Sequence, residues 1–210
     1  MARRIIWRAV VAGSIALALA TSVLVVAGSE VPPIRAVLAA LAVGAGSMIP
    51  PAVASRNRLT LAIAVGAALP IVLAEGGLDV VATMAVFLLG CVLLAAAEFV
   101  RRGSIRGALV YAARQFLGFS GFVCVFAAVR SLVPSSLGAS GWDELGAFVA
   151  GGLAWIAVDI ALWSATASTD GRISPRFVAL SGLRDLNVFI TLIATGGLFG
   201  MMYGAIGWWA

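Results

Sequence analysis

The sequence predicts an all-α fold: a polytopic transmembrane helix bundle of about seven spans, with its N-terminus in the cytoplasm. Of the 210 residues, 62% are hydrophobic and only 11% are charged, whereas about a quarter of an average soluble domain is charged. The apolar residues form long segments separated by short polar ones, and the arginines gather in alternate polar segments. Seven spans of about 20 residues occupy about 140 residues, which leaves little chain for a soluble catalytic domain.

Each predicted span is an apolar segment that ends at a polar or proline-containing turn. The first span ends at Ser29-Glu-Val-Pro-Pro, and the third is short and contains Pro70, where a kink is expected. Arginine-rich connections separate the fourth span from the fifth and the sixth from the seventh. The predicted spans are residues 5–28, 34–54, 59–74, 80–100, 108–133, 145–167 and 186 onward.

The arginines orient the predicted bundle, because basic residues gather in the cytoplasmic loops of membrane proteins. Most of them lie at the N-terminus and after the second, fourth and sixth spans, which are alternate connections and so face one side. They are Arg3, Arg4, Arg8, Arg56, Arg58, Arg101, Arg102, Arg106, Arg172, Arg176 and Arg184. The opposite side has only Arg35 and Arg130. We therefore expect a multi-pass protein of the cell (inner) membrane with a cytoplasmic N-terminus, whose seventh span ends outside at Trp208 and Trp209 unless an eighth span follows.

Two missing residue types exclude most catalytic chemistry. Every basic residue is Arg, and the chain has neither Lys nor His. Schiff-base, P-loop and Ser-Lys chemistry need Lys, and the Ser-His-Asp triad and most zinc, copper or di-iron sites need His. We therefore expect no enzyme, no metal site and no cofactor. The net charge of +5 does not indicate a nucleic-acid partner, because the arginines act as topology signals; the expected partner is the lipid bilayer.

A few polar residues lie deep within predicted spans, where a charge costs several kcal/mol unless it is paired or hydrated. Arg114 and Gln115 lie about 10 Å inside the cytoplasmic end of one span, and Asp159 lies about 12 Å inside that of the next, at 1.5 Å per residue. The two charges would meet if these spans are antiparallel neighbours. Asn187 enters the last span from the same side and would complete the cluster. These four residues are our candidates for a ligand-binding or switch site.

Two interpretations of this cluster stay open. In the first, it is a cytoplasm-facing pocket for an anion or a small polar ligand, or a charge pair whose making and breaking switches the bundle. In the second, Arg114 and Asp159 form a static pair that only fixes the register of two helices.

Glycines and tryptophans indicate packing. Gly196, Gly200 and Gly204 recur every four residues in the last span, a pattern that permits close approach of helices. It favours packing within the chain, with a homodimer as the alternative. Most of Trp7, Trp142, Trp155 and Trp163 lie where an interfacial aromatic belt is expected.

Several short segments resemble a known bacterial membrane domain. They are residues 58–64 (Arg-Leu-Thr-Leu-Ala-Ile-Ala), 110–119 (Val-Tyr-Ala-Ala-Arg-Gln-Phe-Leu-Gly-Phe), 129–132 (Val-Arg-Ser-Leu) and 202–209 (Met-Tyr-Gly-Ala-Ile-Gly-Trp-Trp). Together they resemble the multi-span sensor domain that precedes GGDEF or HD-GYP cyclic-di-GMP domains in bacterial signalling proteins. The resemblance implies that residues 1–210 are a single transmembrane helical domain, the sensor portion of a longer protein.

Three classes of function remain open. The first is an integral membrane sensory or regulatory module that binds a small ligand and signals to a cytoplasmic partner or a fused domain. The second is a transporter, or the substrate-binding subunit of an importer, with a ligand that is lost in Asp159→Asn or Arg114→Ala. The third is a membrane assembly or scaffold subunit whose partner packs on the glycines of the last span.

Overall fold

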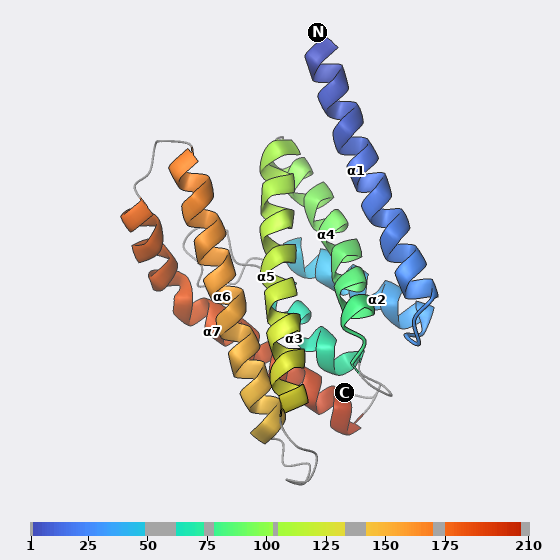
Figure 1. Ribbon diagram of the computed structural model, residues 1–210, viewed down its shortest axis with the longest axis vertical. Helices are drawn as coiled ribbons and strands as arrows, with labels where there is room; N and C mark the ends of the chain where they lie inside the picture. Colours follow the sequence, from blue (N-terminus) through green and yellow to red (C-terminus); the bar gives the residue numbers. More distant parts are fainter. Residues whose placement is uncertain are drawn as a thin grey trace.

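A computed structural model of the chain describes residues 2–48, 62–73, 78–102, 105–132, 142–169 and 175–206. This part of the chain is helical and contains no strand, which confirms the predicted all-α class. The helices are α1 (Ala2–Ala27), α2 (Pro33–Met48), α3 (Ala62–Val72), α4 (Val80–Arg102), α5 (Ile105–Leu132), α6 (Trp142–Thr169) and α7 (Pro175–Ile206) (Figure 1).

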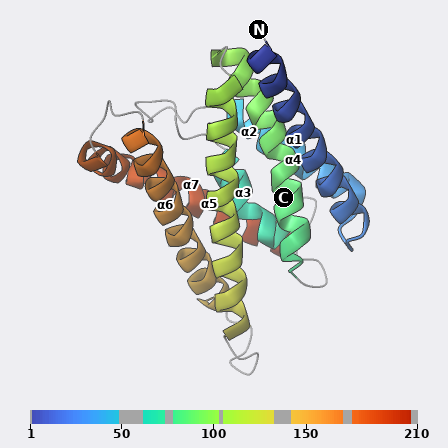
Figure 2. The same cartoon turned by 45° about the horizontal axis from the view of Figure 1, so that its top comes forward.

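Helix α5 lies at the centre of the bundle. It packs along α4 on one side and along α6 on the other, and α3 lies behind it (Figure 1). Helices α1 and α2 pack on α4, and α7 crosses obliquely behind α6 and α5 to contact α3. The view in Figure 2 shows the same order, with α1 and α4 on one flank of α5 and α6 on the other.

Within the residues that the structure describes, three helices are long and apolar enough to cross a lipid bilayer. Their apolar segments are Gly107–Leu132, Leu145–Ala165 and Leu186–Tyr203. Four shorter apolar segments, among the residues described, are Ile15–Ala27, Pro33–Gly46, Ala62–Val72 and Val80–Ala96. The structure is therefore compatible with a membrane protein but does not confirm seven spans. Helix α3 shows why: the 11 residues described for it extend about 16 Å at 1.5 Å per residue, about half the hydrocarbon thickness of a bilayer.

The last helix is longer than the sequence predicted. Helix α7 begins at Pro175 rather than near Leu186, where the continuous apolar run starts. Proline is favourable at the first position of a helix, because its fixed φ suits the helix and its missing N–H would have no partner there. In the second and third predicted spans, residues 49–54, 59–61 and 74 lie outside the described residues.

Helix ends that carry arginines gather at one end of the molecule. The start of α1, the end of α4, the start of α5 and the start of α7 all lie in the upper half of Figure 1. Arg3, Arg102 and Arg176 belong to these ends. This is the arrangement expected when alternate connections share a side. Three other predicted positions, Arg56, Arg58 and Arg172, lie outside the described residues.

Aromatic side chains from several helices form the centre of the core. Phe87 of α4 stacks on Phe119 of α5 with ring centroids 3.9 Å apart, and the Trp155 indole of α6 meets these rings edge-on at 5.9 and 5.6 Å. Trp155 is fully buried, so its expected place in an interfacial belt is wrong. The reason is local: Gly66 and Gly118 face the indole, and a Cβ at either position would crowd or overlap it.

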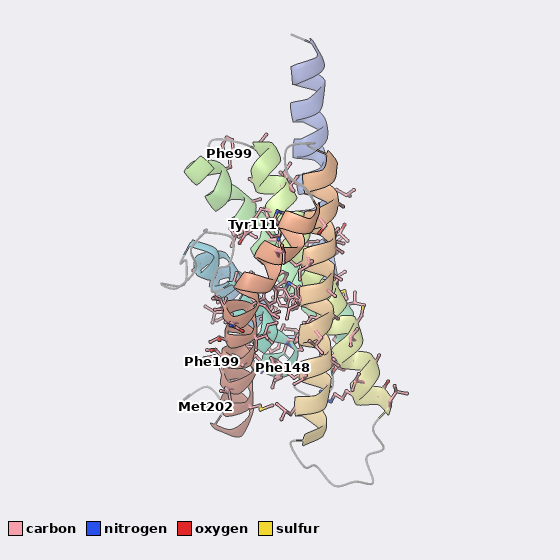
Figure 3. All side chains as sticks on the ribbon, turned by 90° about the vertical axis from the view of Figure 1, so that its left-hand side faces the viewer. Phe99, Tyr111, Phe148, Phe199 and Met202 are labelled. Atoms are coloured by element: carbon pink, nitrogen blue, oxygen red, sulfur yellow. The ribbon has the colours of Figure 1, made fainter. Side chains whose placement is uncertain are left out.

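The glycines of α7 face another helix of the same chain. A Cβ on Gly196 would overlap the backbone carbonyl of Ala64, and one on Gly200 would lie 3.1 Å from the side chain of Ile71. These two glycines therefore allow α3 and α7 to pack closely, as the intramolecular interpretation expects. The surroundings of Gly204 lie outside the described residues. Elsewhere on α7, Gly197 accommodates the ring of Phe148 from α6, which lies between the two helices in Figure 3.

Candidate functional site

Arg114 of α5 and Asp159 of α6 form an ion pair where these helices meet. Nη2 of Arg114 donates to both carboxylate oxygens of Asp159 at 2.6 Å, and Nε donates to Oδ1 at 3.0 Å. The side chains are only 11% and 12% exposed. The contact expected from the depth of the two charges in their spans is therefore present. Charge-assisted hydrogen bonds of this kind are about twice as strong as neutral ones.

The pair lies within two apolar segments, toward the end where the arginines gather. Arg114 is about 10 Å from Gly107, where its segment starts, and Asp159 is about 9 Å from Ala165, where its segment ends, at 1.5 Å per residue. Trp163 follows Asp159 by one helical turn, and the Cζ atom of Arg114 lies 5.9 Å from the centroid of its ring. Such a cation–π contact contributes about 0.5–1 kcal/mol. The carboxylate and the indole together fix the guanidinium.

Two buried polar atoms near the pair lack hydrogen-bond partners. Gln115 is 1% exposed and Trp155 is fully buried, and within the described part of the chain neither Gln115 Oε1 nor Trp155 Nε1 is bonded. Gly118, one turn beyond Gln115, faces the indole nitrogen, so the indole packs on α5 about one turn from the position of Gln115. One atom accepts and the other donates. Because each unsatisfied group costs about 1–3 kcal/mol, a small molecule that bonds to both would stabilise this interface.

Asn187 does not take part in this cluster. Its side chain is exposed, its carbonyl accepts a hydrogen bond from Thr191 Oγ1 at 2.8 Å, and among the described residues no bond joins it to the ion pair. Phe189, two positions later, contacts Trp155 with ring centroids 6.0 Å apart. Two positions correspond to about 200° around a helix, so Asn187 is turned away from the interface that Phe189 enters. The structure therefore brings together Arg114, Gln115 and Asp159 but not Asn187.

The tryptophans of α6 are the part of the site that the sequence interpretation missed. Trp155, Asp159 and Trp163 recur every four residues, which places them on one face of a helix. Both indoles flank the carboxylate along this face, one above the Arg114 contact and one below it. The i, i+4 spacing of aromatic and acidic side chains was the signal that could have revealed their role.

The arrangement suits recognition of an anion. A ligand carboxylate or phosphate presents the same pair of oxygens to a guanidinium as Asp159 does, so it could compete with Asp159 for Arg114. The adjacent amide and indole groups would bond to the polar body of such a ligand. Among the residues that the structure describes, no group of three His, Cys, Asp or Glu side chains could hold a metal ion.

Comparison with known proteins does not extend these observations. No protein-family model matches the chain, and neither does any curated protein or solved structure. The resemblance to sensor domains that precede cyclic-di-GMP domains therefore stays a prediction from the sequence segments that suggested it. The function has to be argued from the chemistry of the site.

Proposed function

We propose that this chain is a multi-pass membrane sensory module with about seven apolar segments and a cytoplasmic N-terminus. It binds a small anionic or polar ligand from the cytoplasmic side at Arg114, Gln115 and Asp159. Binding changes the contact between α5 and α6, and a cytoplasmic partner or a fused output domain reads this change. The common position of the arginine-rich helix ends supports the orientation.

One observation carries the proposal: a buried ion pair lies beside an acceptor and a donor that have no partner among the described residues. A pair that served only to fix helix register would need neither Gln115 nor a hydrogen-bonding indole beside it, and each of these groups is destabilising without a partner. A ligand-binding role accounts for both. It also accounts for the position of the cluster near the cytoplasmic end of two long helices, where a solute can enter without crossing the bilayer.

The proposed switch is an exchange of partners. In the structure, the carboxylate of Asp159 is the counter-charge of the Arg114 guanidinium. An incoming carboxylate or phosphate takes over the guanidinium, and Asp159 is then left in a partly apolar interface with no counter-charge, which is unfavourable. The helix that carries Asp159 therefore shifts so that the carboxylate reaches water. This shift alters the angle or spacing of α5 and α6, so the ligand has a differential affinity for the two states, as a switch requires.

The test is a variant that removes the binding group without harming the fold. Gln115→Leu replaces an unsatisfied buried amide with an apolar side chain of similar size, so a purely structural site should become more stable or stay unchanged. We expect that the full chain, purified in mild detergent, is stabilised thermally by one or more probes among inorganic phosphate, sulfate, acetate and succinate. We expect Gln115→Leu to lose that response.

A control on the same helix separates this loss from a general effect. Ser120 is half-buried and its hydroxyl donates only to the Phe116 carbonyl of its own helix, so Ser120→Ala should keep the response to the probe. Mass spectrometry of small molecules released from the purified chain provides a second readout. If wild type and Gln115→Leu respond equally to every probe and release the same molecules, the ligand-binding proposal is wrong.

A transporter is the second candidate, and helix α3 favours it. This helix is short, contains Pro70, and is largely buried among longer helices, as are the broken helices around transporter binding sites. A transporter exposes its site to both sides of the membrane in turn. In a variant without native cysteines, Gln115→Cys should then react with a membrane-impermeant thiol reagent from either side, whereas a sensor should react only from the cytoplasm.

A further inference from the structure

The site at the ion pair contains hydrogen-bonding groups and charges of both kinds. Arg114 is a cationic donor, and Asp159 is an anionic acceptor. Trp155 Nε1 is a neutral donor and Gln115 Oε1 is a neutral acceptor, and within the described residues neither atom is bonded. A ligand that satisfies all four groups must therefore offer donors as well as acceptors, and a charge of each sign.

The packing of α5 against α6 places these groups along one stretch of the interface. Arg114 of α5 bonds to Asp159 of α6. One turn of α6 from Asp159, the Trp155 indole meets the ring of Phe119 with centroids 5.6 Å apart. Gln115 lies one turn before Phe119, so both occupy the same side of α5, and Gln115 is 1% exposed. Its side chain therefore starts beside the ion pair, on the side of α5 that the indole contacts.

A simple anion would satisfy only part of this set. Ionised carboxylate oxygens accept hydrogen bonds and donate none, so they can bond to the Arg114 guanidinium and the indole but not to Gln115 Oε1 or Asp159. Such a ligand would also leave the carboxylate of Asp159, whose side chain is 12% exposed, without a counter-charge. A simple cation would leave the guanidinium in the same position. Neither class of ligand matches the site as a whole.

We propose that the ligand is a zwitterionic α-amino acid with a neutral side chain, which enters between Arg114 and Asp159. This inference rests on the proposed ligand-binding function and names the class of ligand. The ligand carboxylate accepts hydrogen bonds from the guanidinium and from Trp155 Nε1, and the ligand ammonium group donates to the Asp159 carboxylate and to Gln115 Oε1. Each charge of the site then keeps a counter-charge, and no charge remains to pair with a charged side chain of the ligand.

The ion pair keeps hydrogen-bonding capacity through which such a ligand can enter. Asp159 accepts from Nε and Nη2 of Arg114, which leaves the N–H groups of Nη1 without a partner among the described residues. Nη1 is not one of the fully buried atoms that lack a partner, so a solute can reach it. A ligand between the two charges separates α5 from α6. The change that the proposed switch needs therefore occurs without moving Asp159 into water.

Matched pairs of probes test this inference on the full chain, purified in mild detergent at neutral pH. Glycine, L-alanine and L-phenylalanine are compared with glycolate, L-lactate and L-phenyllactate, in which a hydroxyl replaces the ammonium group. Propionate and ethylamine supply the anion or the cation alone. The concentration dependence of thermal stabilisation gives each Kd. We expect at least one amino acid to bind about tenfold or more tightly than its hydroxy acid, because the hydroxyl leaves Asp159 without a counter-charge.

The variant Asp159→Asn tests the partner of the ammonium group. In this variant the hydroxy acid, which supplies the missing counter-charge of Arg114, should bind at least as tightly as the amino acid. A merely structural role of Asp159 would lower the stability of the chain but would not reverse this preference. Ser120→Ala on α5, whose hydroxyl donates only to its own helix, is the control and should keep the preference of wild type. If Asp159→Asn cannot be purified, the comparison of probes on wild type decides.

The outcomes separate this inference from the proposed function. If the hydroxy acids or propionate bind to wild type as tightly as the amino acids do, the site is an anion site and the inference is wrong. Ethylamine that binds as tightly as the amino acids, or an unchanged preference in Asp159→Asn, would also contradict it. If no amino acid, hydroxy acid or simple anion stabilises the chain, the ligand-binding function itself is wrong.

Discussion

Replacing Asp159 with Asn should destabilise the folded chain by about 3–5 kcal/mol, because it leaves the guanidinium of Arg114 buried without a counter-charge. The geometry supports a value in this range. At a charge separation of about 4 Å and an effective dielectric constant of about 20, the Coulomb attraction is about 4 kcal/mol. The side chains are 11% and 12% exposed, so water screens the pair only slightly. The Trp163 contact, worth about 0.5–1 kcal/mol, remains in the variant and limits the loss.

The double variant Arg114→Met with Asp159→Leu removes both charges and keeps similar side-chain volumes. Replacement of a buried ion pair by apolar side chains is often neutral or stabilising by about 1–4 kcal/mol. We therefore expect the double variant to be about as stable as wild type, although each single variant is less stable than wild type. These variants form a double-mutant cycle. Equilibrium unfolding in mixed micelles of a mild detergent and dodecyl sulfate, followed by far-ultraviolet circular dichroism, gives the free energies of unfolding of wild type, the two single variants and the double variant.

The cycle also separates the static and the ligand-binding interpretations. Under both interpretations, the double variant should lose less stability than the sum of the losses in the two single variants. If the double variant loses as much stability as the two single variants together, the charges do not interact in solution and the ion pair is refuted. If the double variant is stable and still responds to the anionic probes, the pair only fixes helix register. A stable double variant without the response supports the switch.

Three further predictions concern packing and can be checked by thermal unfolding in the same detergent. Gly118→Ala should destabilise the fold by about 1–3 kcal/mol, because the new Cβ overlaps the Trp155 indole. Gly146→Ala should stabilise it by about 0.5–1 kcal/mol, because nothing lies within 4 Å of the new Cβ and Ala is the better helix former; a loss in this variant would contradict the placement of α6. Gly196→Ala must push α3 away from α7 and should lower stability as much as Gly118→Ala does, whereas a second copy of the chain packed at this seam would make its effect depend on protein concentration.

The ion pair could be predicted from the sequence because its prediction needs little tertiary information. Arg114 and Asp159 stand at similar distances from the arginine-rich ends of two consecutive long apolar segments. Consecutive segments joined by a short connection are usually antiparallel neighbours, so equal depth implies contact. The same reasoning failed for Asn187, because depth says nothing about which side of a helix a residue occupies. Its neighbour Phe189 occupies the buried side.

The position of Trp155 could not be predicted, because it depends on the absence of side chains on other helices. Its indole occupies space that Gly66 on α3 and Gly118 on α5 leave free, and these residues are far apart in the sequence. The helical lengths of the spans could not be predicted for a different reason. Hydropathy measures how long an apolar segment is but not how much of it is helical, and the structure describes α3 over 11 residues.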